Sequence, residues 1–291
     1  MKIVYHLGAH ATDDDRLIRA LMKNRAMLAE MGIAVPSPRS YNKLIPKVAK
    51  SLKGAPAGEE AQHVILDAVL EDNSAHRVIF SNENFICFPA NVVSEFGFYA
   101  TMAMRLRAYA NLFPQARTDF FLGLVNPAVL IPALLRKVPE TSYESLMAGR
   151  DPRDLRWAPV IRRAIANVPE AGMTVWCNED TPFIWPEILR IMAGVPPETE
   201  LDGDWDLLRT ILTEEGLTQL QAHMERHPPA TIEERRQVTA RFMEDYARPD
   251  EIEMDVPLPG WTEKLVEDLS RQYEEDCAEI AQIPGIRFIE P

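Results

Sequence analysis

Cysteine is scarce in this chain of 291 residues, which has only Cys87, Cys177 and Cys277, far apart in sequence. An odd number of widely spaced cysteines excludes a disulfide framework and predicts free thiols in a reducing compartment. No apolar run approaches the roughly 20 residues that a membrane-spanning helix needs. The N-terminus has one lysine and a short apolar run that soon meets Asp13, so no signal peptide is expected. We therefore expect a cytoplasmic protein without a membrane partner.

Positive charge is also in short supply. The chain has 31 Lys and Arg against 44 Asp and Glu, a formal net charge of −13. The densest basic stretch, Arg153 to Arg163, is still mixed with Asp151 and Asp154. This balance argues against a surface for nucleic acid or for an anionic membrane. Hydrophobic residues make up 46% of the chain, enough for a sizeable core, which excludes the disordered and fibrous classes.

Short apolar runs that alternate with helical patterns dominate the first two thirds of the chain. Each run is apolar throughout, which is typical of a strand buried on both faces of a parallel sheet. The sequence therefore predicts an α/β fold with helices on both faces of a parallel sheet. The predicted strands are residues 2–8, 77–82, 118–125 and 173–177, and the predicted helices include 16–31, 98–113, 159–167 and two within 40–72.

After about residue 200 the pattern changes to acidic amphipathic helices, predicted at 207–227, 232–246 and 261–282. A short last strand is predicted at 286–289. The proline-containing stretches between these helices are typical of turns and not of domain linkers. We therefore expect one domain over residues 1–291, with an α/β core at 1–200 and a helical C-terminal extension, 201–291, packed on that core.

Ligands of parallel α/β folds bind at the carboxyl ends of the strands. Four loops are expected at this edge: Gly8–Asp15, Asn82–Phe85, Asn126–Ala128 and Asn178–Asp180. Their sequences resemble the bacterial sulfotransferase family, a branch of the P-loop fold. His6–Asp15 is similar to the family's H-x-G-x-x-K-T-G-T-T loop, which holds the 5′-phosphosulfate of the donor PAPS.

Other phrases extend the resemblance over most of the chain, in the order in which the family has them. Ser81–Phe85 is similar to its S-x-E-N-F phrase, and the stretch from Phe113 to Pro127 to its L-F-P-x-A and R-N-P phrases. Val175–Asp180 is similar to V-W-x-x-E-D, and Tyr273–Gly285 also fits the family. The resemblance implies a P-loop, sulfotransferase-like fold.

The departures from the family fall where it has its chemistry. The loop lysine is replaced by Ala11, and the glycine and two threonines that follow are replaced by Asp13, Asp14 and Asp15. The arginine that contacts the 3′-phosphate of PAPS would stand at Val125, and the expected serine falls on Ala133. The resemblance therefore implies a degenerate donor site and no PAPS cofactor.

A phosphate loop binds its anion through backbone N–H groups and a helix N-terminus. Aspartates at this N-terminus can accept the same N–H groups as helix caps. A carboxylate about 5 Å from a phosphate costs roughly 1.5–3 kcal/mol at an effective dielectric of about 20–40. The aspartate run has a second interpretation as a site for a metal or an amine near His6 and His10. The cap is favoured, because consecutive acids rarely all point one way and no spacing here is diagnostic of a metal site.

Glu83, at a predicted strand end, is the best candidate for a general base. Its alternative role is a partner for loop amides or for an arginine such as Arg105. His10 is expected on the loop, where it can be charged near neutral pH, whereas His6 is expected in the core. Glu179 and Asp180 are interpreted as caps of the helix that starts at Pro182.

Two functions remain open. The first is a pseudoenzyme, a sulfotransferase-like protein that binds an unidentified small molecule or protein partner. The second is an active transferase with an atypical donor site. The predicted catalytic residues are Glu83 and His10, no metal is expected, and the predicted ligand-binding residues are Gly8, Ala9, Ala11, Thr12, Asp13, Asp14, Asp15, Asn82 and Asn126.

Overall fold

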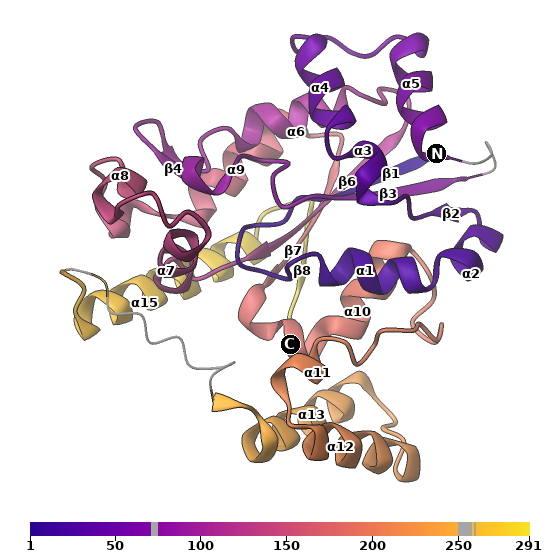
Figure 1. Ribbon diagram of the computed structural model, residues 1–291, viewed down its shortest axis with the longest axis vertical. Helices are drawn as coiled ribbons and strands as arrows, with labels where there is room; N and C mark the ends of the chain where they lie inside the picture. Colours follow the sequence, from indigo (N-terminus) through magenta and orange to yellow (C-terminus); the bar gives the residue numbers. More distant parts are fainter. Residues whose placement is uncertain (71–74, 250–257, 259) are drawn as a thin grey trace.

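A computed structural model describes residues 1–70, 75–249, 258 and 260–291 of the chain. Its centre is a six-stranded, fully parallel sheet with the strand order β2-β3-β1-β6-β7-β8 (Figure 1). A two-stranded antiparallel ribbon, β4-β5, lies apart from it. The strands are β1 (Lys2–His6), β2 (Ile33–Ala34), β3 (Arg77–Ser81), β4 (Val93–Ser94), β5 (Gly97–Phe98), β6 (Arg117–Leu124), β7 (Gly172–Cys177) and β8 (Ile286–Ile289).

Side chains alternate between the two faces of the sheet and build a separate core on each. On one face Tyr5 is surrounded by Phe80, Phe120 and Tyr109, with ring centroids 5.5–5.7 Å apart. On the other face Val4 belongs to the second apolar cluster. Because both faces are covered, a strand apolar at every position is stable here. The prediction of a parallel sheet with helices on both faces is confirmed.

Helices α1, α2 and α10 cover the Val4 face, and most of the others cover the Tyr5 face or lie beyond it (Figure 1). The first half of the chain supplies α1 (Arg16–Lys23), α2 (Arg25–Glu30), α3 (Pro38–Tyr41), α4 (Leu44–Ser51), α5 (Glu59–Val69) and α6 (Met102–Ala110). The second half supplies α7 (Pro127–Lys137), α8 (Tyr143–Met147), α9 (Trp157–Asn167), α10 (Thr181–Ala193), α11 (Leu208–Ile211), α12 (Glu214–Arg226), α13 (Ile232–Tyr246) and α15 (Glu263–Ala281).

Several predicted helices are shorter or broken. The helix predicted at 16–31 breaks at Asn24, whose side chain bonds the backbone of Asp202 in both directions at 2.8 Å. The helix predicted at 207–227 breaks where Leu212 pairs with Ala247 and Thr213 caps α12. The helix predicted at 98–113 begins only at Met102, because Tyr99 has a positive φ of 40°. The helical periodicity of the sequence does not predict these breaks, because they depend on side-chain bonds to distant residues and on single backbone angles.

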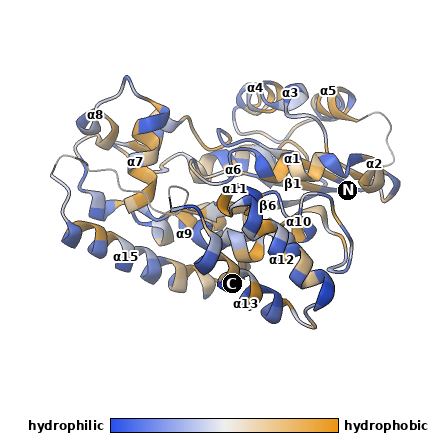
Figure 2. Cartoon of the chain, turned by 60° about the horizontal axis from the view of Figure 1, so that its bottom comes forward, coloured by the Kyte–Doolittle hydropathy of each residue, from blue (hydrophilic) through white to orange (hydrophobic). Residues whose placement is uncertain are grey.

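The chain after residue 200 forms helices and then returns to the sheet. Along α15, hydrophilic and hydrophobic residues alternate (Figure 2). This helix packs against α7 and α9, and β8 then pairs with β7, as predicted for a last strand at 286–289. Helix α13 is tied to α10 by the half-buried ion pair of Arg235 and Glu187, at 2.7 Å. No helix in the described residues is long and apolar enough to cross a bilayer.

Candidate functional site

The loop between β1 and α1 lies at the carboxyl edge of the sheet, beside the end of β3. Gly8, Ala11, Asp14 and Asp15 all have left-handed backbone angles, with φ between 45° and 63°. A Cβ added at Gly8 would stand 2.7 Å from the Cα of Glu83, so only glycine allows this close approach. Gly8 and Glu83 thus end neighbouring strands at one place, as the sequence predicts.

Asp13 is the aspartate that caps α1. Its side chain is buried, and its Oδ2 accepts the backbone N–H of Leu17 at 2.8 Å. Its backbone oxygen accepts the N–H of Arg16 at 2.8 Å. The Thr12 hydroxyl, which the family resemblance places in the phosphate loop, donates instead to Ala9 O at 2.7 Å. The first turn of α1 is therefore closed by the chain's own carboxylate.

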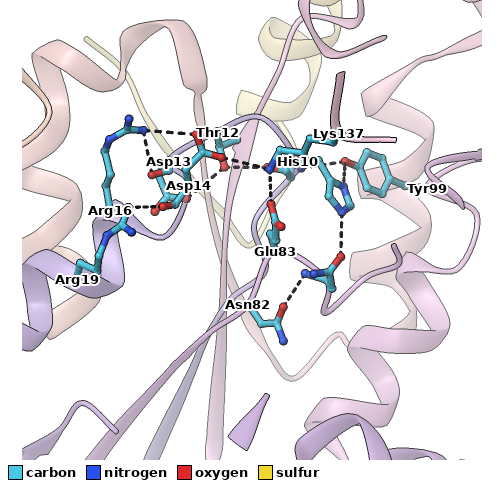
Figure 3. Close-up of polar contacts among 12 residues, drawn as sticks. His10, Thr12, Asp13, Asp14, Arg16, Arg19, Asn82, Glu83, Tyr99 and Lys137 are labelled. Carbon is cyan, nitrogen blue, oxygen red and sulfur yellow. Dashed lines mark hydrogen bonds and ion pairs between the residues drawn. The ribbon is translucent and has the colours of Figure 1, made fainter. Parts of the chain in front are cut away.

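Asp14 and Glu83 share one cation, the side chain of Lys137 from the end of α7 (Figure 3). The Nζ of Lys137 lies 2.6 Å from Glu83 Oε2 and 3.2 Å from Asp14 Oδ1. Burial alone would lower the pKa of Lys137, but the hydrogen bonds and charges of Glu83 and Asp14 outweigh it and raise the pKa. Glu83 is thus paired with a lysine, while its side chain stays 37% exposed.

Asp15 is an exposed residue beside this cluster. The loop partly shields the Asp15 carboxyl group from solvent. This desolvation, together with the charges of Asp13 and Glu83, raises the pKa of Asp15 above its ordinary value. The cluster therefore holds more negative charge than Lys137 neutralises.

His10 belongs to the loop, as predicted, but its side chain is completely buried. Its Nδ1 lies 3.2 Å from the hydroxyl of Tyr99, and its Nε2 lies 3.4 Å from Asn84 Oδ1 (Figure 3). The rings of His10 and Tyr99 are stacked with centroids 6.2 Å apart. Burial lowers the pKa of His10 in spite of the nearby charge of Glu83. The neutral ring is part of the core under the loop.

Asn82 and His6, at the same edge, have structural roles: Asn82 bonds the backbone of the next turn, and His6 is part of the core. Asn82 Oδ1 accepts the N–H of Asn84 at 2.8 Å, which forms the turn after β3. His6 is buried, as predicted, and its Nδ1 lies 2.8 Å from the Ser81 hydroxyl. Its Nε2 has no hydrogen-bond partner among the described residues. Burial lowers the pKa of His6 against the charges of Asp13 and Asp15.

Asn126 lies at the same edge, where β6 ends and α7 begins. Its side chain caps α7 by accepting the N–H of Ala128 at 2.9 Å. Its own N–H donates to Glu179 Oε1 at 3.0 Å, and Glu179 Oε2 is 2.7 Å from the Tyr273 hydroxyl. Of the two predicted caps of the helix that starts at Pro182, Asp180 stands at the N-cap position of α10 but makes no side-chain cap bond. Glu179 instead connects the start of α7 with α15.

The N-terminus of α9 is closed in the same way. Asp276 of α15 is 1% exposed, and its Oδ2 accepts the N–H of Trp157, the first residue of α9, at 2.7 Å. Its carboxylate also binds the guanidinium of Arg156 at 2.8–3.1 Å. The indole N–H of Trp157 donates to Val125 O at 2.8 Å. Val125, where the resemblance would place an arginine, is fully buried.

Sequence reasoning missed Lys137, Tyr99 and Asp276. Their partners are 54, 89 and 119 residues away in the chain, and no local pattern reports such pairings. Cys177 and Cys277 are free thiols, as predicted, but their sulfur atoms lie 3.3 Å apart. In the described part of the chain, no group of three or more His, Cys, Asp or Glu is arranged to hold a metal ion.

No family model, no curated protein and no solved structure matches this chain. What it can do must therefore be inferred from its own residues.

Proposed function

We propose that this chain is a sulfotransferase-like binding protein whose donor site is filled by its own carboxylates, and that it does not transfer sulfuryl groups. One observation carries the proposal. Several helices begin at the carboxyl edge of the sheet, and three of them have a backbone N–H at or just before their start bonded to a carboxylate of this chain, whereas the fourth, α10, has no side-chain cap. These carboxylates are Asp13 at α1, Glu179 at the residue before α7 and Asp276 at α9.

Parallel α/β folds bind phosphate and sulfate groups through such amides, because a helix N-terminus presents positive potential. A carboxylate that belongs to the chain occupies the amides without losing the freedom that a free ligand loses on binding. A phosphate must displace it and then lie beside its charge. The cations at the loop are already engaged: Lys137 is held by Glu83 and Asp14, and the guanidinium groups of Arg16 and Arg19 contact Asp13 and Asp14.

The second candidate is an active transferase with an atypical donor site, in which Glu83 and His10 act. One observation favours it, namely that Glu83 is partly exposed beside Lys137, an arrangement that can exchange protons with a ligand. His10 weighs against it, because a buried neutral ring bonded to Tyr99 cannot reach a substrate. We therefore place the binding protein first and leave its ligand or protein partner unidentified.

Calorimetry with PAP, the product nucleotide of PAPS, tests the proposal. The wild-type chain should show a Kd weaker than about 1 mM, which corresponds to less than about 4 kcal/mol of binding free energy. The variant Ala11→Lys, Asp13→Gly, Asp14→Thr, Asp15→Thr restores the loop residues of the family. It should gain measurable affinity, and more at low salt, because the gain is electrostatic.

The matched control is Glu225→Lys, Glu274→Lys, which changes the net charge by the same amount at exposed positions of α12 and α15. It should bind PAP no better than the wild type. Micromolar binding of PAP by the wild-type chain would overturn the proposal and favour the transferase. A folded loop variant that stays inert at every salt concentration would show that packing, and not charge, closes the site.

A further inference from the structure

A second region of the molecule is hollowed, away from the candidate site. A groove of about 810 Å³ lies between α4, α6 and α9, three neighbouring helices on the Tyr5 face of the sheet (Figure 1). Helix α6 ends shortly before β6 begins, and α9 ends shortly before β7 begins. The C-terminal ends of both helices therefore lie toward the amino edge of the sheet. The C-terminal half of α9 and most of the length of α6 line the groove.

The walls of this groove are positive, although the chain as a whole carries a net charge of −13. Its lining includes five basic side chains and no acidic one: Lys50, Lys53, Arg105, Arg107 and Arg163. Arg107 is engaged with Glu170 and with the backbone oxygen of Asn167. Within residues 1–70, 75–249, 258 and 260–291, the side chains of the other four make no ion pair and no hydrogen bond. The Nε of Arg105 is buried and without a partner.

This buried donor is significant because an unsatisfied polar atom costs free energy, and more so on a charged group. Surface cations normally lie near carboxylates in an acidic protein, yet here four stand together around one hollow. Guanidinium and ammonium groups bind carboxylate, sulfate and phosphate oxygens through charge-assisted hydrogen bonds. The groove is thus built to receive an oxyanion.

Apart from Gly54 and the polar Asn167, the remaining lining is apolar. It consists of small side chains and one methionine that is 61% exposed: Ala49, Ala103, Met104, Ala108 and Ala166. Small side chains leave room for a ligand, and a flexible methionine packs against varied apolar shapes. The volume is in the range of pockets that hold small molecules.

We propose that this groove binds a small molecule that carries an oxyanion on an apolar body. The cations hold the anionic group, and the alanine and methionine surface covers the rest. A nucleic acid would bring its charges close to the acidic remainder of the protein, whereas a single anion meets only the groove. The proposal is independent of the donor site, since no residue of the carboxyl edge lines the groove.

Two fluorescent probes separate the contributions of charge and apolar surface. The sulfonate 8-anilino-1-naphthalenesulfonate is an oxyanion on an aromatic body, and N-phenyl-1-naphthylamine is the same body without the charge. The test variant is Lys50→Gln, Arg163→Gln. The control is Lys47→Gln, Arg162→Gln, which removes the same charge from the same two helices at positions outside the groove.

The wild-type protein should bind the sulfonate with a Kd below about 1 mM and bind the neutral probe at least about tenfold more weakly. The test variant should weaken sulfonate binding about tenfold or more, and the control should change it less than about twofold. Circular dichroism should show both variants folded. Equal sulfonate affinity in the test and control variants would overturn the proposal. Equal affinity of the wild type for both probes, or no sulfonate binding at about 1 mM, would also overturn it.

Discussion

The carboxyl edge of the sheet and the groove between α4, α6 and α9 differ in how far their charged side chains are paired within the chain. At the edge, charged groups have partners within the chain: Asp13 and Asp276 cap helices, and Lys137 is shared by Glu83 and Asp14. In the groove, Lys50, Lys53, Arg105 and Arg163 surround a hollow without a carboxylate among its lining residues. The edge is where this fold class binds ligands, and the groove is not.

Taken with the two proposals, this difference implies that fold position and binding capacity separate in this molecule. Helix N-termini attract anions wherever they lie, and a carboxylate of the same chain satisfies them as well as a ligand does. Lysine and arginine side chains on the sides of helices form ion pairs only when a carboxylate lies near them. On the two proposals above, unpaired charge beside a hollow predicts binding in this molecule better than the end of a strand does.

The largest expected effect comes from removing an internal partner of the edge. Asp276→Ala should lower the free energy of unfolding by about 3 kcal/mol, because it leaves Arg156 and the N–H of Trp157 without their buried acceptor. Denaturant titration measures the change. The control Glu274→Ala, at an exposed position of α15, should stay within about 0.5 kcal/mol of wild type. Equal effects would show that the edge is not held by its own carboxylates.

Much of the fold could be predicted from the sequence, because it depends on local patterns. The apolar run around Tyr5 predicts a strand buried on both faces, and β1 indeed lies between β3 and β6. The aspartate run suggested a helix cap with two acids in the first turn. Asp13 does accept the N–H of Leu17, but α1 begins only at Arg16, after all three aspartates. Strand bounds agree within two residues, since buried strands end where polar turn residues begin.

The parts that could not be predicted depend on pairings between distant residues. Nothing near Lys137 indicates that it reaches Glu83 and Asp14, and nothing near Asp276 indicates a bond to Trp157. From the sequence, His10 is a loop residue; its burial depends on stacking against the ring of Tyr99, which is distant in the chain. The basic groove was missed for the same reason: its cations come from three helices that are separate in sequence and are neighbours only in the fold.

The second prediction concerns pH. His6 and His10 have pKa values lowered by burial from the ordinary value of 6.5, so the unfolded state binds their protons more readily. Stability should therefore be full above pH 6.5 and fall below it, by at most about 1.4 kcal/mol per pH unit for each histidine. The raised pKa of Asp15 acts in the opposite direction, at lower pH, where its protonation favours the folded state.

Denaturant titrations between pH 5 and 8 test this prediction. His10→Asn should lower stability at pH 7.5 but reduce its loss on acidification, whereas His63→Gln, at an exposed position of α5, should keep the wild-type pH profile. A wild-type stability that is flat from pH 8 to pH 5 would contradict the burial of both rings.

A smaller effect is expected from the shared cation of the edge. Lys137→Met keeps much of the apolar stem and removes the charge between Glu83 and Asp14. Because all three side chains are partly exposed, stability should fall by only about 1 kcal/mol, and by less at high salt. Lys47→Met, at an exposed position of α4, is the control and should have almost no effect. A loss that does not depend on salt would indicate packing in place of the ion pairs.

The smallest effect concerns the shape of the loop itself. Ala11 has a φ of 63°, a conformation that costs a residue with a Cβ about 1 kcal/mol or more and that glycine adopts freely. Ala11→Gly relieves this strain but also gives the unfolded chain more freedom, so the two effects largely offset each other. The variant should be as stable as wild type or up to about 0.5 kcal/mol more stable, as measured by denaturant titration. Ala222→Gly, in the right-handed backbone of α12, should instead cost about 1 kcal/mol. There glycine also gives the unfolded chain more freedom, but no backbone strain is relieved to offset this cost. If both variants lost the same stability, Ala11 would not be left-handed, and the loop at the edge would lack the shape on which the Asp13 cap depends.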